Sequence, residues 1–143
     1  MVGSFFSKTD EKEIVEAIRA AERLTTGQIH VHVRNKCEQD ALAESHRLFK
    51  KLGLHKTNHR NAVLIFLAPE SRKLAILGDA GIHEKVRGYF WDRTRDAILD
   101  CFKRNEIKKG LLEGIQGVGE KLRRHFPSGA GGTNPLLDAV TED

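Results

Sequence analysis

The sequence predicts one soluble α/β domain, a three-layer α/β/α sandwich around a mixed central sheet. Segments with helical hydrophobic periodicity alternate with short apolar segments typical of strands, in the order α-β-α-β-β-α-α. The first two strands are separated by a helix, which requires parallel pairing, whereas only a short polar turn separates the second strand from the third. The length of 143 residues, 39% of them apolar, suits one hydrophobic core and is short for two.

Two amphipathic helices are predicted in the first half of the chain. Ser7 or Thr9 can cap the first helix, which opens with acidic residues and carries an apolar stripe until Gly27 ends it. Residues 39–52 return to helical periodicity, and the following Gly53 suits the left-handed conformation found after helix ends. Helices placed between strands in this way can cover both faces of a sheet.

Three strands are predicted in the middle of the chain. Residues 28–34 alternate apolar and polar side chains, so we expect a half-buried strand whose polar face carries His30 and His32. Residues 62–67 are continuously apolar, which is typical of a strand covered on both faces at the centre of a sheet. A short polar break precedes residues 74–77, so the third strand should return antiparallel to the second.

Two more helices and a tail complete the predicted domain. An aromatic-rich helix should carry apolar residues from 86 to 102, and a last helix should span residues 107–126. Three consecutive rings at 89–91 cannot all face one core, so we expect Phe90 inside and another ring over a neighbouring element or in a partner surface. The domain should thus cover residues 5–127, followed by a Gly-rich, then weakly acidic flexible tail over residues 128–143. The apolar end of that tail could dock on the domain or on a partner, and the pattern leaves a short fourth strand open, in the tail or just before the second strand.

Composition excludes several functional classes. The 24 Lys and Arg residues are interspersed with 20 Asp and Glu residues and form no basic stripe, so we expect no nucleic-acid binding. Cys37 and Cys101 have no paired spacing, which predicts free thiols without a zinc motif or disulfide framework. No basic leader segment and no run of about 18 apolar residues is present, so we expect a cytoplasmic protein without a membrane span.

Three polar turns are expected to meet at one edge of the predicted sheet. Residues 25–28 precede the first strand, residues 58–61 precede the second, and residues 78–81 follow the third. Because an antiparallel third strand ends beside the beginnings of the other two, these turns should be neighbours in space. The edge is therefore the place where a ligand site is expected.

The polar side chains of this edge match the ligands of hard cations. Asp79, Gln28 and Asn61, with Glu22 close in sequence, offer the carboxylate and amide oxygens that Ca²⁺ and Mg²⁺ prefer. Two acids are few, so the predicted metal binding is weak. The alternative is that Asp79 only stabilises its glycine-flanked turn by accepting backbone N–H bonds.

Several short segments together resemble a known family. In chain order they are Phe5-Phe6-Ser7, Ala21-Glu22, Thr26-Gly27-Gln28-Ile29-His30-Val31, Asn61-Ala62-Val63-Leu64-Ile65 and Leu77-Gly78-Asp79-Ala80-Gly81-Ile82. Their order and spacing resemble the TPM domain, a family named for a thylakoid lumen protein, a photosystem II repair protein and an acetylcholine-receptor modulator. The resemblance spans residues 5–127. It implies an α/β/α sandwich, divalent-cation binding in some members, acid phosphatase activity, and a polar site at the same strand edge.

Two residues depart from the pattern of the family. This chain has Gln28 where the family usually has Glu, and Ala62 where the family usually has Gly. The first departure removes a negatively charged ligand, which should weaken the binding of a hard cation.

Other candidate residues carry weaker signals. His30 and His32 could share a metal at their i, i+2 spacing, but a zinc site needs further ligands, so we favour a covered polar strand face. His83 is a candidate neighbour of the Asp79 turn. For phosphoryl chemistry, Asp79 and Arg60 could serve as metal ligand and phosphate clamp, although no nucleophile motif is present.

The function predicted from these observations is a non-catalytic binding or assembly module with a weak calcium or magnesium site. The alternative is a metal-assisted acid phosphatase that acts on phosphomonoesters. We expect a protein partner, which the sequence does not identify.

Overall fold

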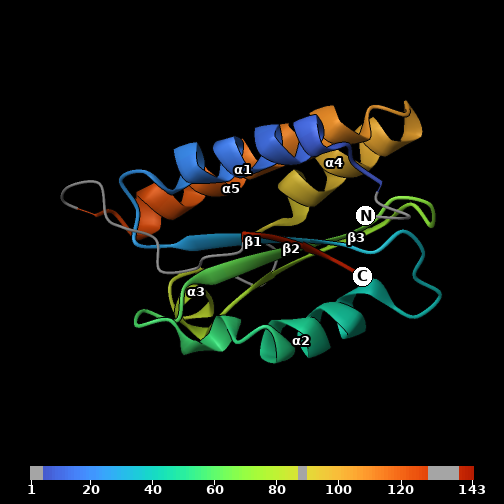
Figure 1. Cartoon of the computed structure of the whole chain (residues 1–143). Helices are drawn as coiled ribbons and strands as arrows, with labels where there is room; N and C mark the ends of the chain where they lie inside the picture. The colour runs from blue at the N-terminus through green and yellow to red at the C-terminus, as the bar shows by residue number, and fades with distance from the viewer. Residues whose placement is uncertain (1–4, 87–89, 129–138) are drawn as a thin grey trace.

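Four strands form one mixed sheet that lies between two layers of helices (Figure 1). The computed structural model describes residues 5–86, 90–128 and 139–143. The elements in chain order are α1 (Lys8–Glu22), β1 (Gln28–Val33), α2 (Ala41–Lys51), the 3₁₀ helix η1 (Leu54–Lys56), β2 (Ala62–Ala68), β3 (Lys73–Gly78), α3 (Ala80–His83), α4 (Asp92–Lys103), α5 (Ile107–His125) and β4 (Val140–Glu142).

The sheet has the strand order β3-β2-β1-β4. Strands β1 and β2 are parallel, in a register that pairs Gln28 with Ala62, and β3 returns antiparallel to β2. These pairings confirm the predicted parallel pair and hairpin. The short strand β4 lies parallel to β1 on its other side, so the fourth strand that the sequence left open is formed by the end of the chain.

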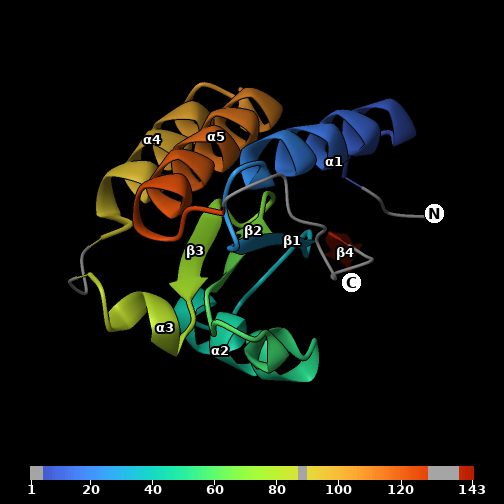
Figure 2. The ribbon, with the colours of Figure 1, turned by 90° about the vertical axis from the view of Figure 1, so that its left-hand side faces the viewer.

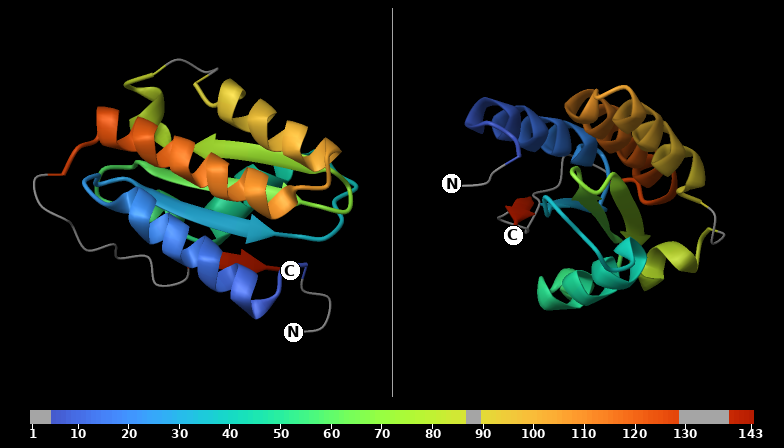
Figure 3. Two further views of the ribbon diagram at one scale, coloured as in Figure 1. Left: turned by 90° about the horizontal axis from the view of Figure 1, so that it is seen from above. Right: turned by 90° about the vertical axis from the view of Figure 1, so that its right-hand side faces the viewer.

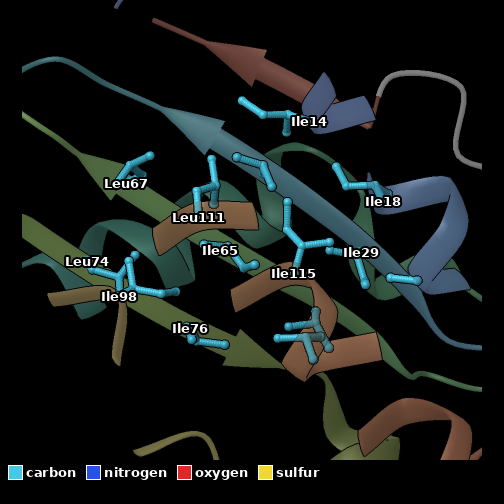
Figure 4. Close-up of a cluster of buried hydrophobic side chains, with 14 of the residues drawn as sticks. Ile14, Ile18, Ile29, Ile65, Leu67, Leu74, Ile76, Ile98, Leu111 and Ile115 are labelled. Atoms are coloured by element: carbon cyan, nitrogen blue, oxygen red, sulfur yellow. The ribbon is translucent and has the colours of Figure 1, made fainter. Parts of the chain in front are cut away.

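Helices cover both faces of the sheet. Helices α1, α4 and α5 lie on one face, and α2 lies on the other (Figure 2). Seen from above, α1 and α5 run side by side over the strands (Figure 3). Their apolar side chains meet those of the sheet in the larger of two buried clusters, whose labelled members are Ile14, Ile18, Ile29, Ile65, Leu67, Leu74, Ile76, Ile98, Leu111 and Ile115 (Figure 4). The smaller cluster joins α2 and η1 to the opposite face through Leu48, Phe49, Leu54, Leu64 and Phe66.

The prediction that β1 is half-buried was wrong. All six residues of β1 are buried, including the polar residues Gln28, His30 and His32. The alternation in the sequence reflects two different environments, because the apolar residues face the larger cluster while the histidines are covered by hydrogen-bonding neighbours.

The first helix ends earlier than Gly27. It begins at the predicted cap, since the Ser7 hydroxyl accepts a hydrogen bond from the Asp10 N–H, and it ends at Glu22. Beyond it, the Thr26 N–H donates to the Phe126 carbonyl at 3.0 Å, so the chain leaves helical geometry to join the end of α5.

The predicted aromatic-rich helix is two helices. The short α3 is capped by Asp79, and α4 begins only after Trp91; Tyr89 lies outside the described residues. Trp91 is buried, while Phe90 is only partly buried and meets it edge to face at 4.6 Å. The expected inward position of Phe90 is thus taken by the larger indole ring.

Both cysteines are free, as predicted, and both are buried. None of the helices in the described part of the chain combines the length and apolar character that a bilayer crossing needs.

The end of the predicted flexible tail is paired with the sheet. Residues 129–138 lie outside the described residues, but the Val31 N–H donates to the Ala139 carbonyl at 2.8 Å and the Asp143 N–H donates to the Val33 carbonyl at 3.0 Å. The reason is that β1 would otherwise present unpaired backbone groups on this side.

Acid should release the last residues of the chain from β1. Hydrogen bonds from Arg34, assisted by His32, lower the pKa of Asp143 from 3.8 to about 2. A lowered pKa means that this carboxylate stabilises docking fully above about pH 4 and loses that effect as the pH falls towards 2. We expect the amide signals of residues 139–143 to approach unfolded positions over this range, before those of β2, in an NMR pH titration. A tail spectrum unchanged at pH 2 would contradict this.

Candidate functional site

The three polar turns meet at one edge of the sheet, as the sequence predicts. The Asp79 N–H donates to the Ala62 carbonyl at 3.0 Å, and Ala62 is paired with Gln28 on its other side. Residues opposite one another in neighbouring strands share a face, so Gln28 and Asp79 flank the small side chain of Ala62 on the α2 face. Their backbones are two strand spacings apart, about 10 Å, and their side chains can converge above Ala62.

Asp79 makes the central ion pair of this edge. Its carboxylate accepts hydrogen bonds from Arg60 Nε at 2.7 Å and Arg60 Nη2 at 2.9 Å, and from the Ala80 N–H at 2.8 Å. It therefore caps α3, which is the turn-stabilising role that the sequence left open. Asp79 is buried, whereas 50% of the Arg60 side chain is exposed. The carboxylate raises the pKa of the Arg60 guanidinium above its ordinary value.

Gly81 connects the two turns that carry this ion pair through a backbone hydrogen bond. Its N–H donates to the Arg60 carbonyl at 2.8 Å. A β-carbon at this position would run into the His59 carbonyl oxygen and would lie 2.6 Å from the Arg60 carbonyl oxygen. Arg60 itself has a positive φ of 50°, which shows how tightly the turn before β2 is folded.

Two buried amide oxygens lie at the start of β1 and β2. Asn61 donates from Nδ2 to the Thr26 hydroxyl at 2.9 Å, which ties the two turns together. Within the described residues, Asn61 Oδ1 and Gln28 Oε1 are buried and have no hydrogen-bond partner. A buried polar atom left unpaired costs about 1–3 kcal/mol, so such oxygens point to a water molecule or an ion.

Glu22 lies away from this group. It accepts a hydrogen bond from the Ile29 N–H at 2.7 Å. The Ile29 and Val31 N–H groups point to the same side of β1, and Val31 bonds to Ala139, so Glu22 lies on the β4 side of β1. Asp79 lies beyond β2 on the opposite side. Glu22 thus provides the acceptor for a backbone N–H on this side of β1.

At this edge the structure pairs Asp79 with Arg60 and joins Asn61 to Thr26, while Gln28 lies opposite Ala62. Over residues 5–86, 90–128 and 139–143, no group of three or more His, Cys, Asp or Glu residues is arranged to hold a metal ion. A cation at this edge would need amide and hydroxyl oxygens beside a single carboxylate. The sequence already indicated that Arg60 could lie near Asp79, because the turns of residues 58–61 and 78–81 were expected to be neighbours.

The histidines lie elsewhere. His30 and His32 are buried against Thr141, which agrees with the covered polar face that we favoured over a shared metal. His83 ends α3 with its side chain exposed, and its N–H is 3.4 Å from the Asp79 carbonyl oxygen.

The comparison with known families decides the classification. The sequence model of the TPM domain matches residues 3–121. The chain belongs to the TPM domain family. This agrees with the resemblance seen in its turns and strands. No protein with a curated functional description matches the chain.

Solved structures of similar proteins share this TPM fold. The NMR structure of the BA42 protein from the psychrophilic bacterium Bizionia argentinensis is 36% identical, covers 100% of this chain and 99% of its own, and has a TM-score of 0.90. The N-terminal domain of the cg2496 protein from Corynebacterium glutamicum is 18% identical, with coverage of 94% and 82% and a TM-score of 0.66. The N-terminal domain of a protein from P. gingivalis is 15% identical, with coverage of 92% and 83% and a TM-score of 0.67. The last two show the fold alone.

Proposed function

We propose that this TPM domain is a non-catalytic binding module that holds Ca²⁺ or Mg²⁺ weakly at the end of β3. The cation would take oxygens from Asp79, Gln28 and Asn61. The observation that carries this proposal is the pair of buried amide oxygens, Gln28 Oε1 and Asn61 Oδ1, which have no hydrogen-bond partner among the described residues and belong to the same sheet edge as Asp79. Glu22 contributes no direct ligand in this proposal, because its carboxylate caps the Ile29 N–H on the far side of β1.

The affinity should be low for two physical reasons. Cation affinity depends on the number of charged ligands, and Asp79 is the single carboxylate among the three proposed ligands, since position 28 is an amide. In addition, a cation must compete with the Arg60 guanidinium for both Asp79 oxygens. Dissociation constants of about 10⁻⁴–10⁻³ M, as in extracellular calcium modules, are therefore expected.

Removal of the competing cation should strengthen metal binding. We expect Arg60→Gln to increase the affinity for Ca²⁺ by no more than about fivefold, because an ion pair that involves a half-exposed arginine is weak. Amide shifts in an NMR titration measure this change. The matched control is Arg95→Gln on α4, where the partners Asp92 and Asp96 are exposed. Arg95 borders the first half of β3, at residues 74–76, and not its end at Asp79, so affinity should not change. Weaker binding in Arg60→Gln would contradict the competition.

The adjacency of Arg60 and Asp79 supports one enzymatic alternative. A cation on Asp79 would release the guanidinium, which could then hold a phosphate oxygen, as a metal-assisted phosphomonoesterase requires. Hydrolysis of a chromogenic phosphate ester distinguishes the two functions. Turnover that needs added metal and is lost in both Asp79→Asn and Arg60→Gln favours the enzyme, whereas no turnover between acidic and neutral pH favours the binding module.

A further inference from the structure

A polar network holds the last residues of the chain against the edge of β1 that is opposite β2. The Thr141 hydroxyl lies 2.8 Å from His30 Nε2 and 2.7 Å from His32 Nδ1. Both rings are buried, with 3% of each residue exposed, and the His32 ring stacks on Phe66 at 6.0 Å between ring centres. One hydroxyl thus bridges one ring nitrogen of each buried imidazole.

The geometry selects a hydroxyl at this position. His32 Nε2 lies 2.9 Å from an Asp143 oxygen, close but not aligned for a linear hydrogen bond, and this negative charge favours the proton on Nε2. His32 Nδ1 is then an acceptor for the Thr141 O–H, and the same hydroxyl oxygen can accept from His30 Nε2. Only a group that both donates and accepts fits between the two rings, and among short side chains Ser and Thr provide it.

The next contact selects a carboxylate two residues later. Arg34 donates to Asp143 from Nε at 2.8 Å and from Nη2 at 3.0 Å, while its Nη1 binds Glu44 at 2.8 Å. Arg34 also borders a hollow of about 560 Å³, otherwise lined by Glu44, His46, Arg47, Leu48, Lys50 and Lys51. Glu44, the one acid there, is already paired with Arg34 and Arg47, so the hollow favours further negative charge.

We propose that this edge of β1 is a binding site for an extended acidic segment of a partner protein, and that residues 139–143 occupy it in cis. The segment would run parallel to β1, with Ser or Thr opposite His32 and a carboxylate two residues further on. Backbone pairing supplies affinity and the two side chains supply selectivity, as in other cases of strand addition to a sheet edge. The proposal is independent of the cation site, which lies at the start of β1 and towards β2.

Two full-length variants test the hydroxyl. Thr141→Val keeps the shape of the side chain but leaves two buried ring nitrogens without their partner, so the amide hydrogen of Val31, which binds Ala139, should exchange about tenfold faster or more. Thr141→Ser should stay within about threefold of the wild type. The Ile65 amide in β2 is the internal control. Equal exchange of Val31 in all three proteins would overturn the selection of a hydroxyl.

A peptide added in trans tests the site itself. The receptor is the full-length Thr141→Val/Asp143→Asn variant, whose own tail docks weakly, and the probe is the peptide Asp-Ala-Val-Thr-Glu-Asp of residues 138–143. We expect saturable shifts of the Val31 amide and of the His30 and His32 rings. A peptide that carries the same two substitutions should bind at least tenfold more weakly.

Three results would overturn the proposal. The first is equal binding of the two peptides, and the second is no saturable shift with either peptide. The third is a wild-type chain that dimerises at NMR concentration with intermolecular contacts to Val31, which would assign the edge to a second copy. Unchanged Asp79 signals during the peptide titration keep this test separate from that of the cation site.

Discussion

Gly81→Ala is expected to destabilise the domain by about 3 kcal/mol, near the upper end for overpacking of a tight site. The added methyl group would meet the backbone carbonyls of His59 and Arg60, which cannot rotate away as a side chain can. The turn before β2 would have to move, and with it the hydrogen bond between the Gly81 N–H and the Arg60 carbonyl. Chemical unfolding with a constant m-value measures the change in free energy of unfolding.

The matched control is the same substitution in α5. A β-carbon at Gly117 would lie 3.7 Å from the nearest atom, on Thr94, at ordinary van der Waals distance. Because Ala is favoured over Gly by about 1 kcal/mol inside a helix, Gly117→Ala should stabilise the domain. Two Gly→Ala changes of opposite sign would support the close contact of the turns, and a stable Gly81→Ala protein would refute it.

Phe66→Ala should cost about 3–5 kcal/mol, the range for large aromatic residues in a core. Phe66 is among the largest fully buried side chains and joins the cluster between β2 and α2. Its ring also supports the site of the tail, since His32 stacks on it and the Arg34 guanidinium lies 5.3 Å from its centre. The substitution should therefore lower global stability and also loosen residues 139–143.

Leu42→Ala on α2 is the control for Phe66→Ala. Its side chain is 49% exposed, so the free energy of unfolding should change by no more than about 0.5 kcal/mol. Similar losses of unfolding free energy in Phe66→Ala and Leu42→Ala would contradict a specific role of Phe66 in the packing between β2 and α2.

The layers and strand directions could be predicted because they depend on local patterns. The continuous apolar run of β2 required cover on both faces, and the length of each connection set whether neighbouring strands were parallel. The burial of β1 could not be predicted in this way, because its two histidines are covered by Thr141, which is more than 100 residues away in sequence.

The meeting of the three turns at one sheet edge was predicted, but their contacts were not. Topology alone placed the turns of Gln28, Asn61 and Asp79 at one edge. Arg60, which pairs with Asp79 through two nitrogens, has a positive φ of 50°. Hydrophobic periodicity does not reveal such a backbone conformation. Glu22 lies on the β4 side of β1 and is therefore separated from Asp79. The position of β4 could not be predicted, because a strand of three residues has too short a sequence pattern.

The measurement that tests the central claim most directly is an NMR titration of the full-length protein with Ca²⁺ and Mg²⁺. We predict saturable amide shifts confined to residues 26–28, 58–62 and 78–83, abolished in Asp79→Asn. They should be retained in Glu22→Gln, which keeps an acceptor for the Ile29 N–H. Shifts centred on His30 and His32, shifts that survive Asp79→Asn, or no saturable shifts up to millimolar metal would contradict a cation site at the end of β3.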